Sequence, residues 1–580
     1  MKQIHDARLA RAGNRRRTAK KMATTAATVG AVAIALAACG STTPTTKSSS
    51  TPSTPSSKSA VLTMESSPSG PVTRDFNPFA PTSADNILGA TNLIYEPLYQ
   101  WDLVKPGTMY PWLATGYKWS NGGKTITFTI RKGVKFSNGE AFNAADVAFV
   151  FNLLKKYPAI NTGGLPIASA SAPNATTAIV NFTSPSYTLL YYITNTDMVP
   201  EAQWKSVNPQ TYADPDPIGT GPYVLKTFSP DGLTLTKNPH YWQSGEPHVT
   251  TVFFPVYDSN QSANLALEQG TLDWGGNFVS NIRRTYVAKD PATHKYWDAP
   301  LQTEALIPNL TRFPFTSLAV RKAIAVGVDR SLISSEGEDH QQPPAIGPGS
   351  LTGLTLPIDD SYLTAATRKY TTEYSTSACK ATLEAAGWKL GSNGYFTSPS
   401  GKELAFTILD PAAYTDFITD DQIMAAQLKK CGMDVTIQGD SVAAWTTALV
   451  DGNFQAITHW GNSGPTPYYL YNNYLNSSLS APIGKAAAGD YERFNSSQAD
   501  AYLTQFSSSD SPSVQKAAIV GLEKIVATQL PIIPLFYGVA WDEYNTTHFT
   551  GWPTPSNPYA PGEPTGPFNE ITLLHLQPKS

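Results

Sequence analysis

The stretch KTITFTIRKGVKFSNGE at residues 124–140 indicates the fold of this 580-residue chain more clearly than any other segment. Ile126, Phe128 and Ile130 alternate with threonines, which is the period of a strand with one buried face. The Ser-Asn-Gly step at 137–139 favours a turn. The stretch therefore predicts a half-buried strand followed by a tight turn.

A helix is expected directly after this turn. Asn143 fits an N-cap, and Asp146 then lies in the first helical turn. One face of the helix carries its apolar side chains, which are Val147, Val150, Phe151 and Leu154. The spacing of the apolar residues therefore changes within a few positions from every second residue, typical of a strand, to the spacing of a helix.

Other segments extend this mixture of strands and helices. Strands at 223–226 and 233–236 are predicted to pair across a turn at 229–232. Helices are predicted at 321–333 and at 378–386, the second ended by Gly387. Strands and helices do not alternate strictly, so the sequence predicts a mixed α/β protein. At about 150 residues per domain, a chain of this length is expected to form at least two lobes.

The amino-terminal segment changes the charge of the chain. Residues 1–38 contain eight Lys or Arg residues and one acidic residue. Without them, the totals of 42 basic and 45 acidic residues fall to 34 and 44, a net charge of −10. An acidic body of this kind disfavours nucleic acid as a partner.

The signature at 128–140, followed by Ala-Ala-Asp-Val at 144–147, closely resembles that of bacterial extracellular solute-binding proteins of family 5. This is the peptide/nickel class that serves ABC importers, and it includes oligopeptide-binding and cellobiose-type oligosaccharide-binding members. Four further segments match in the expected order: IYEPL at 94–98, GTGPY at 219–223, NPHYW at 238–242, and VRKAI at 320–324 with Asp329-Arg330. The resemblance extends from about residue 60 to the end of the chain.

The resemblance implies a periplasmic-binding-protein-like fold of two α/β lobes with an enlarged first lobe. Lobe I is expected to comprise residues 60–305 together with 530–580, and lobe II residues 306–529. The ligand is expected in the cleft between them, where closure around it shifts the open and closed populations. The closed, loaded monomer would then deliver its cargo to an ABC permease.

The segment before residue 60 predicts export and anchoring. Residues 1–38 combine a basic region with an apolar run, as in a secretory signal peptide. Leu-Ala-Ala-Cys at 36–39 resembles the lipobox of bacterial lipoproteins, which implies a lipid on Cys39 and a place on the extracytoplasmic face of the cell membrane. Residues 39–59, rich in Ser, Thr and Pro, are expected to form a disordered tether. Whether export uses the Sec or the Tat route stays open.

Two cysteines remain in the body of the chain. Outside the cell, Cys379 and Cys431 could form a disulfide, or both could be buried thiols. The eight histidines show no spacing typical of a chelate, and we expect neither a metal site nor a cofactor.

The segment HWGNSGPTPYY at 459–469 bears on the ligand. In peptide-binding members of the family, an aspartate in the corresponding Trp-rich segment pairs with the peptide ammonium group. This segment has no carboxylate, which favours a sugar over a peptide. Sugar sites combine flat aromatic rings with polar side chains. We therefore predict Trp460 as a platform, with Asn462 and Tyr468 as polar partners.

A second aromatic cluster lies at 272–278, and a third at 551–559. Both resemble family members that bind cellobiose-like oligosaccharides. In the cluster at 272–278, we predict Trp274 as a second platform and Asn277 as a polar partner. The favoured ligand is therefore a small oligosaccharide.

Three alternatives stay open. The first is an oligopeptide-binding protein of the same transport class. The second is a secreted hydrolase, although the sequence has no G-x-S-x-G or H-E-x-x-H motif and no recognisable carboxylate pair. The third is a receptor that reports ligand occupancy to a membrane partner. We predict binding without catalysis.

Overall fold

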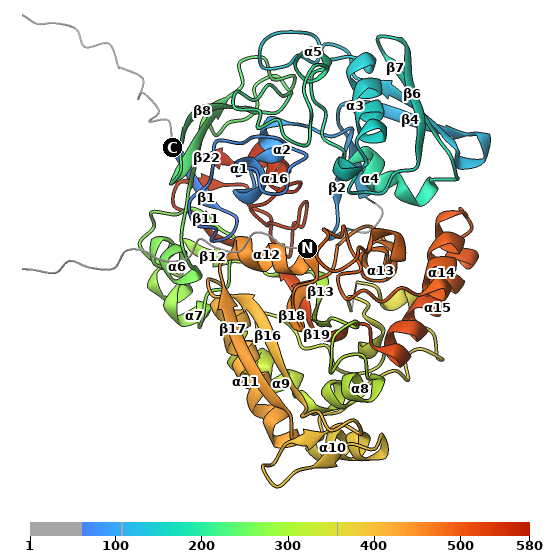
Figure 1. Ribbon diagram of the computed structural model, residues 1–580. Helices are drawn as coiled ribbons and strands as arrows, with labels where there is room; N and C mark the ends of the chain where they lie inside the picture. Colours follow the sequence, from blue (N-terminus) through green and yellow to red (C-terminus); the bar gives the residue numbers. More distant parts are fainter. Residues whose placement is uncertain (1–60, 106–107, 357, 580) are drawn as a thin grey trace, which may run out of the picture. The chain divides into compact units, whose positions relative to one another are not determined.

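In the computed structural model (Figure 1), the signature stretch and the residues that follow it form the predicted strand, turn and helix. In β5 (Thr125–Ile130), Ile126 and Phe128 are fully buried. In α3 (Ala144–Lys156), the Asn143 side chain accepts a hydrogen bond from the Ala145 backbone N–H at 2.8 Å. The Asp146 carboxylate accepts one from the Asn143 N–H at 3.0 Å, which completes a capping box.

The structure describes residues 61–105, 108–356 and 358–579. The predicted signal peptide at 1–38, the predicted lipidation site Cys39 and the predicted tether at 39–59 lie outside the described residues. Within them, no helix is both long enough and apolar enough to span a membrane.

Two sheets make up the part of the molecule that we call lobe I. One is a four-stranded antiparallel sheet in the order β4 (Ala114–Ser120), β5, β7 (Thr177–Phe182) and β6 (Ile167–Asn174), with α3 packed against β6 and β7. The other has seven strands in the order β12 (His294–Tyr296), β20 (Glu543–Asn545), β11 (Trp274–Gly275), β1 (Val61–Glu65), β10 (Thr251–Pro255), β9 (Gly232–Lys237) and β8 (Tyr223–Ser229). The predicted pairing of strands at 223–226 and 233–236 is confirmed by β8 and β9.

A five-stranded mixed sheet forms the centre of what we call lobe II. Its order is β17 (Asp434–Asp440), β16 (Ala405–Pro411), β18 (Ala456–Trp460), β13 (Ala299–Pro308) and β19 (Ile533–Ala540). β16 runs parallel to β17 and β18, whereas β13 runs antiparallel to β18 and β19. Both lobes thus have a sheet that buries apolar side chains.

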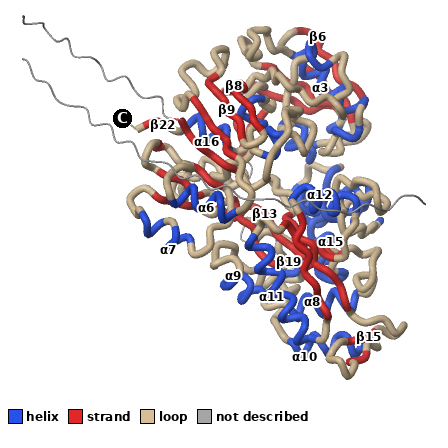
Figure 2. Tube along the Cα trace, turned by 60° about the vertical axis from the view of Figure 1, so that its left-hand side comes forward, coloured by secondary structure: helices blue, strands red, loops and turns tan. Residues whose placement is uncertain are grey.

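The chain passes between the two lobes along neighbouring strands. β12 of the seven-stranded sheet leads into β13 through residues 297–298, and β19 leads back into β20 through 541–542. β13 and β19 pair with each other, and Figures 1 and 2 show them side by side. Two adjacent crossings of this kind form a natural hinge. The predicted lobe boundaries, 305/306 and 529/530, fall within β13 and shortly before β19.

The predicted helix at 321–333 is in fact two helices, α8 (Leu318–Gly327) and α9 (Arg330–Glu336). Asp329 interrupts the helical run because its side chain accepts a hydrogen bond from the Leu332 backbone N–H at 3.2 Å and so caps a new helix. The other predicted helix is α10 (Thr376–Ala385), and it ends before Gly387, whose φ is +84°.

A disulfide joins Cys379 of α10 to Cys431, the last residue of α11 (Thr415–Cys431). Both cysteines are fully buried in the apolar core of lobe II. Of the two states that the sequence left open, the structure therefore has the disulfide.

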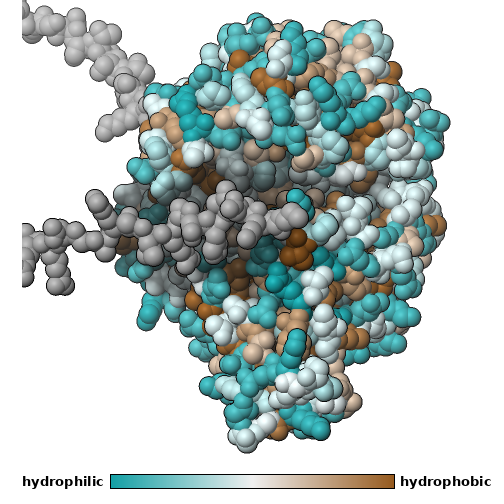
Figure 3. Space-filling view, in the orientation of Figure 1, coloured by the Kyte–Doolittle hydropathy of each residue, from teal (hydrophilic) through white to brown (hydrophobic). Residues whose placement is uncertain are grey.

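The remaining helices cover the sheets and edges. They are α1 (Ala84–Ile87), α2 (Thr91–Ile94), α4 (Leu190–Thr194), α5 (Glu201–Trp204), α6 (Asn260–Glu268), α7 (Ile282–Thr285), α12 (Val442–Asp451), α13 (Tyr468–Leu475), α14 (Ser497–Ser507), α15 (Pro512–Gln529) and α16 (Asn569–His575). Three short ribbons pair β2 (Tyr99–Asp102) with β3 (Thr108–Pro111), β14 (Lys389–Leu390) with β15 (Phe396–Thr397), and β21 (Phe549–Thr550) with β22 (Gln577–Pro578). On the face shown in Figure 3, hydrophobic residues are scattered among hydrophilic ones.

Candidate ligand-binding site

A cavity of about 380 Å³ lies at the hinge and receives side chains from both lobes. This volume lies within the range of small-molecule sites, about 300–1,000 Å³. Its walls come from β13, from the start of α11, from the end of β18, and from the segments at 276–278, 539–541 and 563–568. The crossing strands therefore form part of the site itself, so a ligand in this cavity contacts the hinge.

Aromatic rings cover much of the wall of the cavity. The rings come from Tyr191, Phe278, Tyr414, Phe417, Trp460, Trp541 and Phe568. Trp460 is half-buried and stacks on His459, with 4.5 Å between the ring centroids and 18° between the planes. Burial lowers the pKa of His459 to about 4, so the ring behind Trp460 is neutral at physiological pH. The Trp460 indole is thus supported by a second flat ring.

Carboxylates from three separate segments complete the wall: Glu304 of β13, Asp416 in the first turn of α11, and Glu563. Glu304 accepts a hydrogen bond from the Gln342 amide at 3.3 Å, and Asp416 accepts one from the Asn260 amide at 3.3 Å. No lysine, arginine or histidine of the described chain lines the cavity. The cavity is therefore acidic as well as aromatic.

Burial raises the pKa of all three carboxyl groups. The pKa rises to about 8 for Glu304, to about 6 for Asp416 and to about 7 for Glu563. For Glu304, the neighbouring charge of Asp416 adds to this effect. Near neutral pH, the cavity thus holds carboxyl groups that take up or release protons according to what they contact.

Two of the predicted ligand residues, Trp460 and Asn277, line this same cavity. They come from different lobes and are 183 positions apart in the sequence. The Asn277 side-chain N–H donates to Glu65 at 3.4 Å, and its backbone N–H donates to Glu543 at 3.3 Å. The Asn277 side-chain oxygen is buried and accepts no hydrogen bond within the described structure.

Asn462, a third predicted residue, lines a small recess beside the cavity. The two spaces share Leu301, Gln302 and Ser463 in their walls. Asn462 therefore lies next to the cavity, at the side where the segment at 462–467 leaves β18.

The structure does not bring Trp274 or Tyr468 to the cavity, contrary to what their clusters suggested. Trp274 is fully buried in β11, where its indole N–H donates to Asp542 at 3.0 Å and to the Gly562 carbonyl at 2.9 Å. Tyr468 is 5% exposed and stacks on Phe506 with a centroid distance of 5.1 Å. Both rings pack against other aromatic rings in the core, so neither has a face open to the cavity.

The carboxylates of the cavity were not predicted from the sequence. Glu304 could have been singled out from the sequence, because it is the one charged residue of the strand APLQTEALIP at 299–308. An isolated buried charge requires a partner or a function. Asp416 looked like an ordinary first-turn acid of a helix. Only the fold shows that both residues face one space with Trp460.

The two lobes, the paired crossing strands and the cavity between the lobes define this protein as a two-lobed solute-binding protein of the periplasmic type. Residues 108–481 match the family model of "Bacterial extracellular solute-binding proteins, family 5 Middle", and the chain belongs to this family. The family relationship predicted from the signature motifs is confirmed.

Individual relatives differ in what their names say they bind. The nickel-binding periplasmic protein of Escherichia coli is 27% identical, over 65% of this chain and 72% of its own length. Protein XP55 of Streptomyces lividans is 28% identical, over 77% of this chain and 80% of its own length. The fold is similar to that of a mannohexaose-bound periplasmic oligopeptide-binding protein of Thermotoga maritima, with a TM-score of 0.82, 24% identity, and coverage of 90% of this chain and 99% of that one.

Across the described part of the chain, no group of three or more His, Cys, Asp or Glu side chains is arranged to hold a metal ion.

Proposed function

We propose that this protein is the extracytoplasmic solute-binding lipoprotein of an ABC importer, and that it captures a small oligosaccharide of the cellobiose type without catalysing a reaction. The observation that carries this proposal is the combination of Trp460 with Asn277, Gln302 and Glu304 around one cavity. Sugars present apolar C–H faces to aromatic rings and hydroxyl groups to polar side chains. The lipid on Cys39 would hold the protein at the membrane beside its permease.

An oligopeptide is the alternative cargo, and the carboxylates of the cavity could pair with its ammonium group. The free carboxylate of a peptide, however, would find no basic side chain in the described wall. Enclosing that charge without a partner costs several kcal/mol of binding free energy. A sugar without a carboxylate avoids this penalty, so the wall favours the oligosaccharide.

Closure of the lobes around the ligand is supported by hydrogen bonds that join them. Asn260 of lobe I donates to Asp416 of lobe II at 3.3 Å, and the Ser67 hydroxyl donates to the Tyr414 hydroxyl at 3.4 Å. At a further point, the Tyr469 hydroxyl donates to the Thr188 carbonyl at 2.6 Å. A ligand that contacts both lobes would favour the state in which these bonds form.

The proposal is tested by isothermal titration calorimetry of the purified mature protein against cellobiose, cellotriose and a panel of di- and tripeptides. We expect saturable binding of a sugar with a one-to-one stoichiometry. Mass spectrometry of small molecules released from the protein purified from its host provides a second readout. Binding of peptides without any binding of sugars would contradict the proposal.

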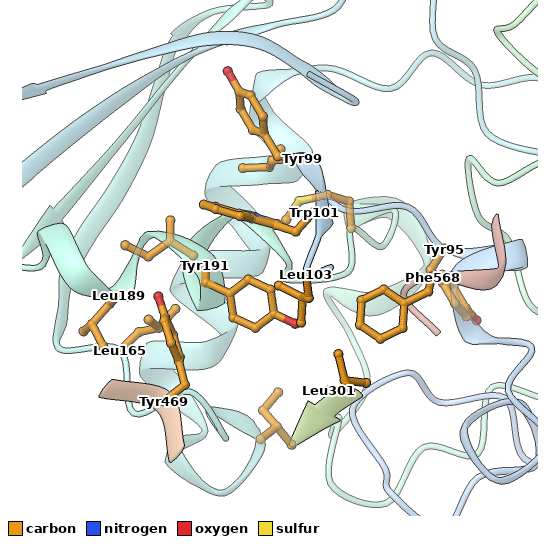
Figure 4. Close-up of a cluster of buried hydrophobic side chains, with 14 of the residues drawn as sticks. Tyr95, Tyr99, Trp101, Leu103, Leu165, Leu189, Tyr191, Leu301, Tyr469 and Phe568 are labelled. Atoms are coloured by element: carbon orange, nitrogen blue, oxygen red, sulfur yellow. The ribbon is translucent and has the colours of Figure 1, made fainter. Parts of the chain in front are cut away.

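The Tyr469→Phe variant is expected to weaken ligand binding by about fivefold, because the closed state loses one interlobe hydrogen bond worth about 1 kcal/mol. Figure 4 shows the Tyr469 side chain near Tyr191, and their ring centroids are 5.2 Å apart. The aromatic contact is kept in the variant. The measurement is the dissociation constant from the same titration.

The matched control is Tyr223→Phe. The Tyr223 hydroxyl also donates to a backbone carbonyl, that of Val249 at 2.9 Å, but both residues belong to lobe I. This variant should lose stability without losing affinity. Equal effects of the two variants on affinity would show that the Tyr469 bond does not contribute to closure.

A further inference from the structure

The charges around the cavity are one-sided. Glu304, Asp416 and Glu563 line it, and neither the cavity nor the recess beside it includes a basic side chain among the described residues. None of the ion pairs in the described structure involves these three carboxylates. Buried carboxylates are normally paired with a cation or hydrogen-bonded to several donors. Burial favours the protonated form of these groups, and a cation bound in the cavity would favour their ionised form.

The acceptors in the wall are only partly satisfied. Glu304 is 3% exposed, and only its Oε2 accepts a hydrogen bond from a described residue, that from Gln342. Asp416 is 6% exposed; its Oδ1 accepts a hydrogen bond from the Asn260 side chain, and the backbone N–H groups of Asp416 and Phe417 also donate to its carboxyl group. The side-chain oxygen of Asn277, which is 3% exposed, has no donor. Glu304 and Asp416, both more than nine-tenths buried in the wall of one cavity, thus have acceptor capacity left for a ligand.

A primary ammonium group matches these acceptors better than a hydroxyl does. It carries three N–H donors, no acceptor and one positive charge. Bonds between an ammonium and a carboxylate are about twice as strong as those between neutral groups. The rings of Trp460 and Phe417 lie in the same wall, and aromatic faces attract cations.

We propose that the ligand carries a primary ammonium group that Glu304 and Asp416 bind, and that the cargo is an amino-sugar oligosaccharide. The inference rests on the proposed function for the sugar, but the ammonium site rests on the wall alone. Glu304 belongs to the hinge strand β13, and Asp416 lies in the first turn of α11, where it contacts Asn260 of lobe I. A bound ammonium group would therefore tie the hinge to the closing contact between Asp416 and Asn260.

Three disaccharides test the proposal: the β-1,4-linked glucosamine dimer, its N-acetylated counterpart and cellobiose. They carry an ammonium, an acetamide and a hydroxyl group, respectively, at carbon 2 of each ring. Titration calorimetry at pH 6.5 and low salt should show the glucosamine dimer binding at least about tenfold more tightly than the other two. A dipeptide amide, which has an ammonium group and no carboxylate, is the fourth ligand.

The variants Glu304→Gln and Asp416→Asn keep the shape of each side chain but cannot ionise to pair with a cation. Each should remove most of the preference for the glucosamine dimer over cellobiose, so that the ratio of the two dissociation constants falls toward one. Glu384→Gln is the matched control, because Glu384 is an exposed residue of α10 outside the cavity. Because the two variants lie on different elements, misfolding of one leaves the other as a test.

The outcomes separate the two proposals. If cellobiose binds as tightly as the glucosamine dimer, or if both variants keep the preference, the ammonium site is wrong and the oligosaccharide function stands. If only the dipeptide amide binds and the variants abolish its binding, the ammonium site stands and the oligosaccharide function is wrong. If none of the four ligands binds, both proposals are wrong.

Discussion

The Trp460→Ala variant is expected to bind the proposed oligosaccharide ligand about 100-fold more weakly than the unchanged protein does. Trp460 is a half-buried ring of the cavity that comes from lobe II and stacks on His459. Removing it takes away the flat apolar surface on which a sugar ring rests, a contribution of about 3 kcal/mol. Tryptophans at the centre of a buried contact are frequently its largest single contributors.

The measurement is the dissociation constant by titration calorimetry, together with the melting temperature of each variant. Trp460→Phe should lose less affinity, because a smaller ring remains in the same place. The matched control is Trp119→Ala, which removes a partly buried tryptophan of β4 that packs on Phe182 and Tyr187 in lobe I. If both alanine variants change the affinity equally, Trp460 is not the platform.

The sequence was sufficient for the elements that local patterns determine. The alternation of Ile126, Phe128 and Ile130 gave β5, and the capping signals of Asn143 and Asp146 gave α3. The break between α8 and α9 shows the limit, because the apolar pattern continues across Asp329 while its side chain caps a second helix. Helical periodicity alone does not distinguish one helix from two that follow each other closely.

The candidate site was predictable only in part, for a related reason. Trp274 and Trp460 lie in similar clusters of aromatic and small residues, yet only Trp460 lines the cavity. Trp274 belongs to a strand between two others, where Asp542 and Gly562 satisfy its indole N–H. Which ring faces a ligand depends on partners far away in the sequence. Glu304 and Asp416 were missed because their common wall exists only in the folded chain.

Outside the cavity, two buried carboxyl groups of lobe I lie side by side and share a donor. The Trp112 indole N–H donates to Glu96 at 2.8 Å and to Glu570 at 3.2 Å. Both carboxyl groups are fully buried. Burial raises the pKa of Glu96 to about 7, and burial together with the charge of Glu96 raises that of Glu570 well above its usual value. The pair is therefore stable when it holds at least one proton.

The sign of the pH dependence follows from these raised pKa values. In the unfolded chain both groups titrate near 4.5, so the stability that the pair contributes is fully present below that pH. As the pH rises from 4.5 through about 7 and above, the unfolded state releases protons that the folded state retains. The free energy of unfolding of the unchanged protein should therefore fall over this range.

The Glu570→Gln variant is expected to unfold with a free energy about 3 kcal/mol higher than that of the unchanged protein at pH 8.5, and within about 1 kcal/mol of it at pH 5. The amide carries no charge to bury beside Glu96, and its oxygen can still accept from Trp112 and Tyr241. Its N–H can donate to the Gln100 oxygen, which has no partner in the described structure, once the Gln100 amide turns over. The substitution therefore removes the charge and keeps an N–H···O bond between residues 100 and 570.

Urea unfolding between pH 5 and pH 9 measures this difference directly. Other buried carboxyl groups also titrate over this range, but they do so equally in both proteins, so the difference between the two profiles isolates the pair. Glu384→Gln, an exposed substitution in lobe II, should leave the profile unchanged. A Glu570→Gln profile parallel to that of the unchanged protein would mean that the pair is ionised in the folded state, with Trp112 and Trp242 compensating for two charges. The Trp242 indole N–H donates to Glu96 at 2.9 Å, so the IYEPL motif, which contains Glu96, contacts the NPHYW motif, which contains Trp242. A weaker pH dependence in Glu570→Gln would instead show that these two signature segments surround a carboxyl pair that shares a proton in the core of lobe I.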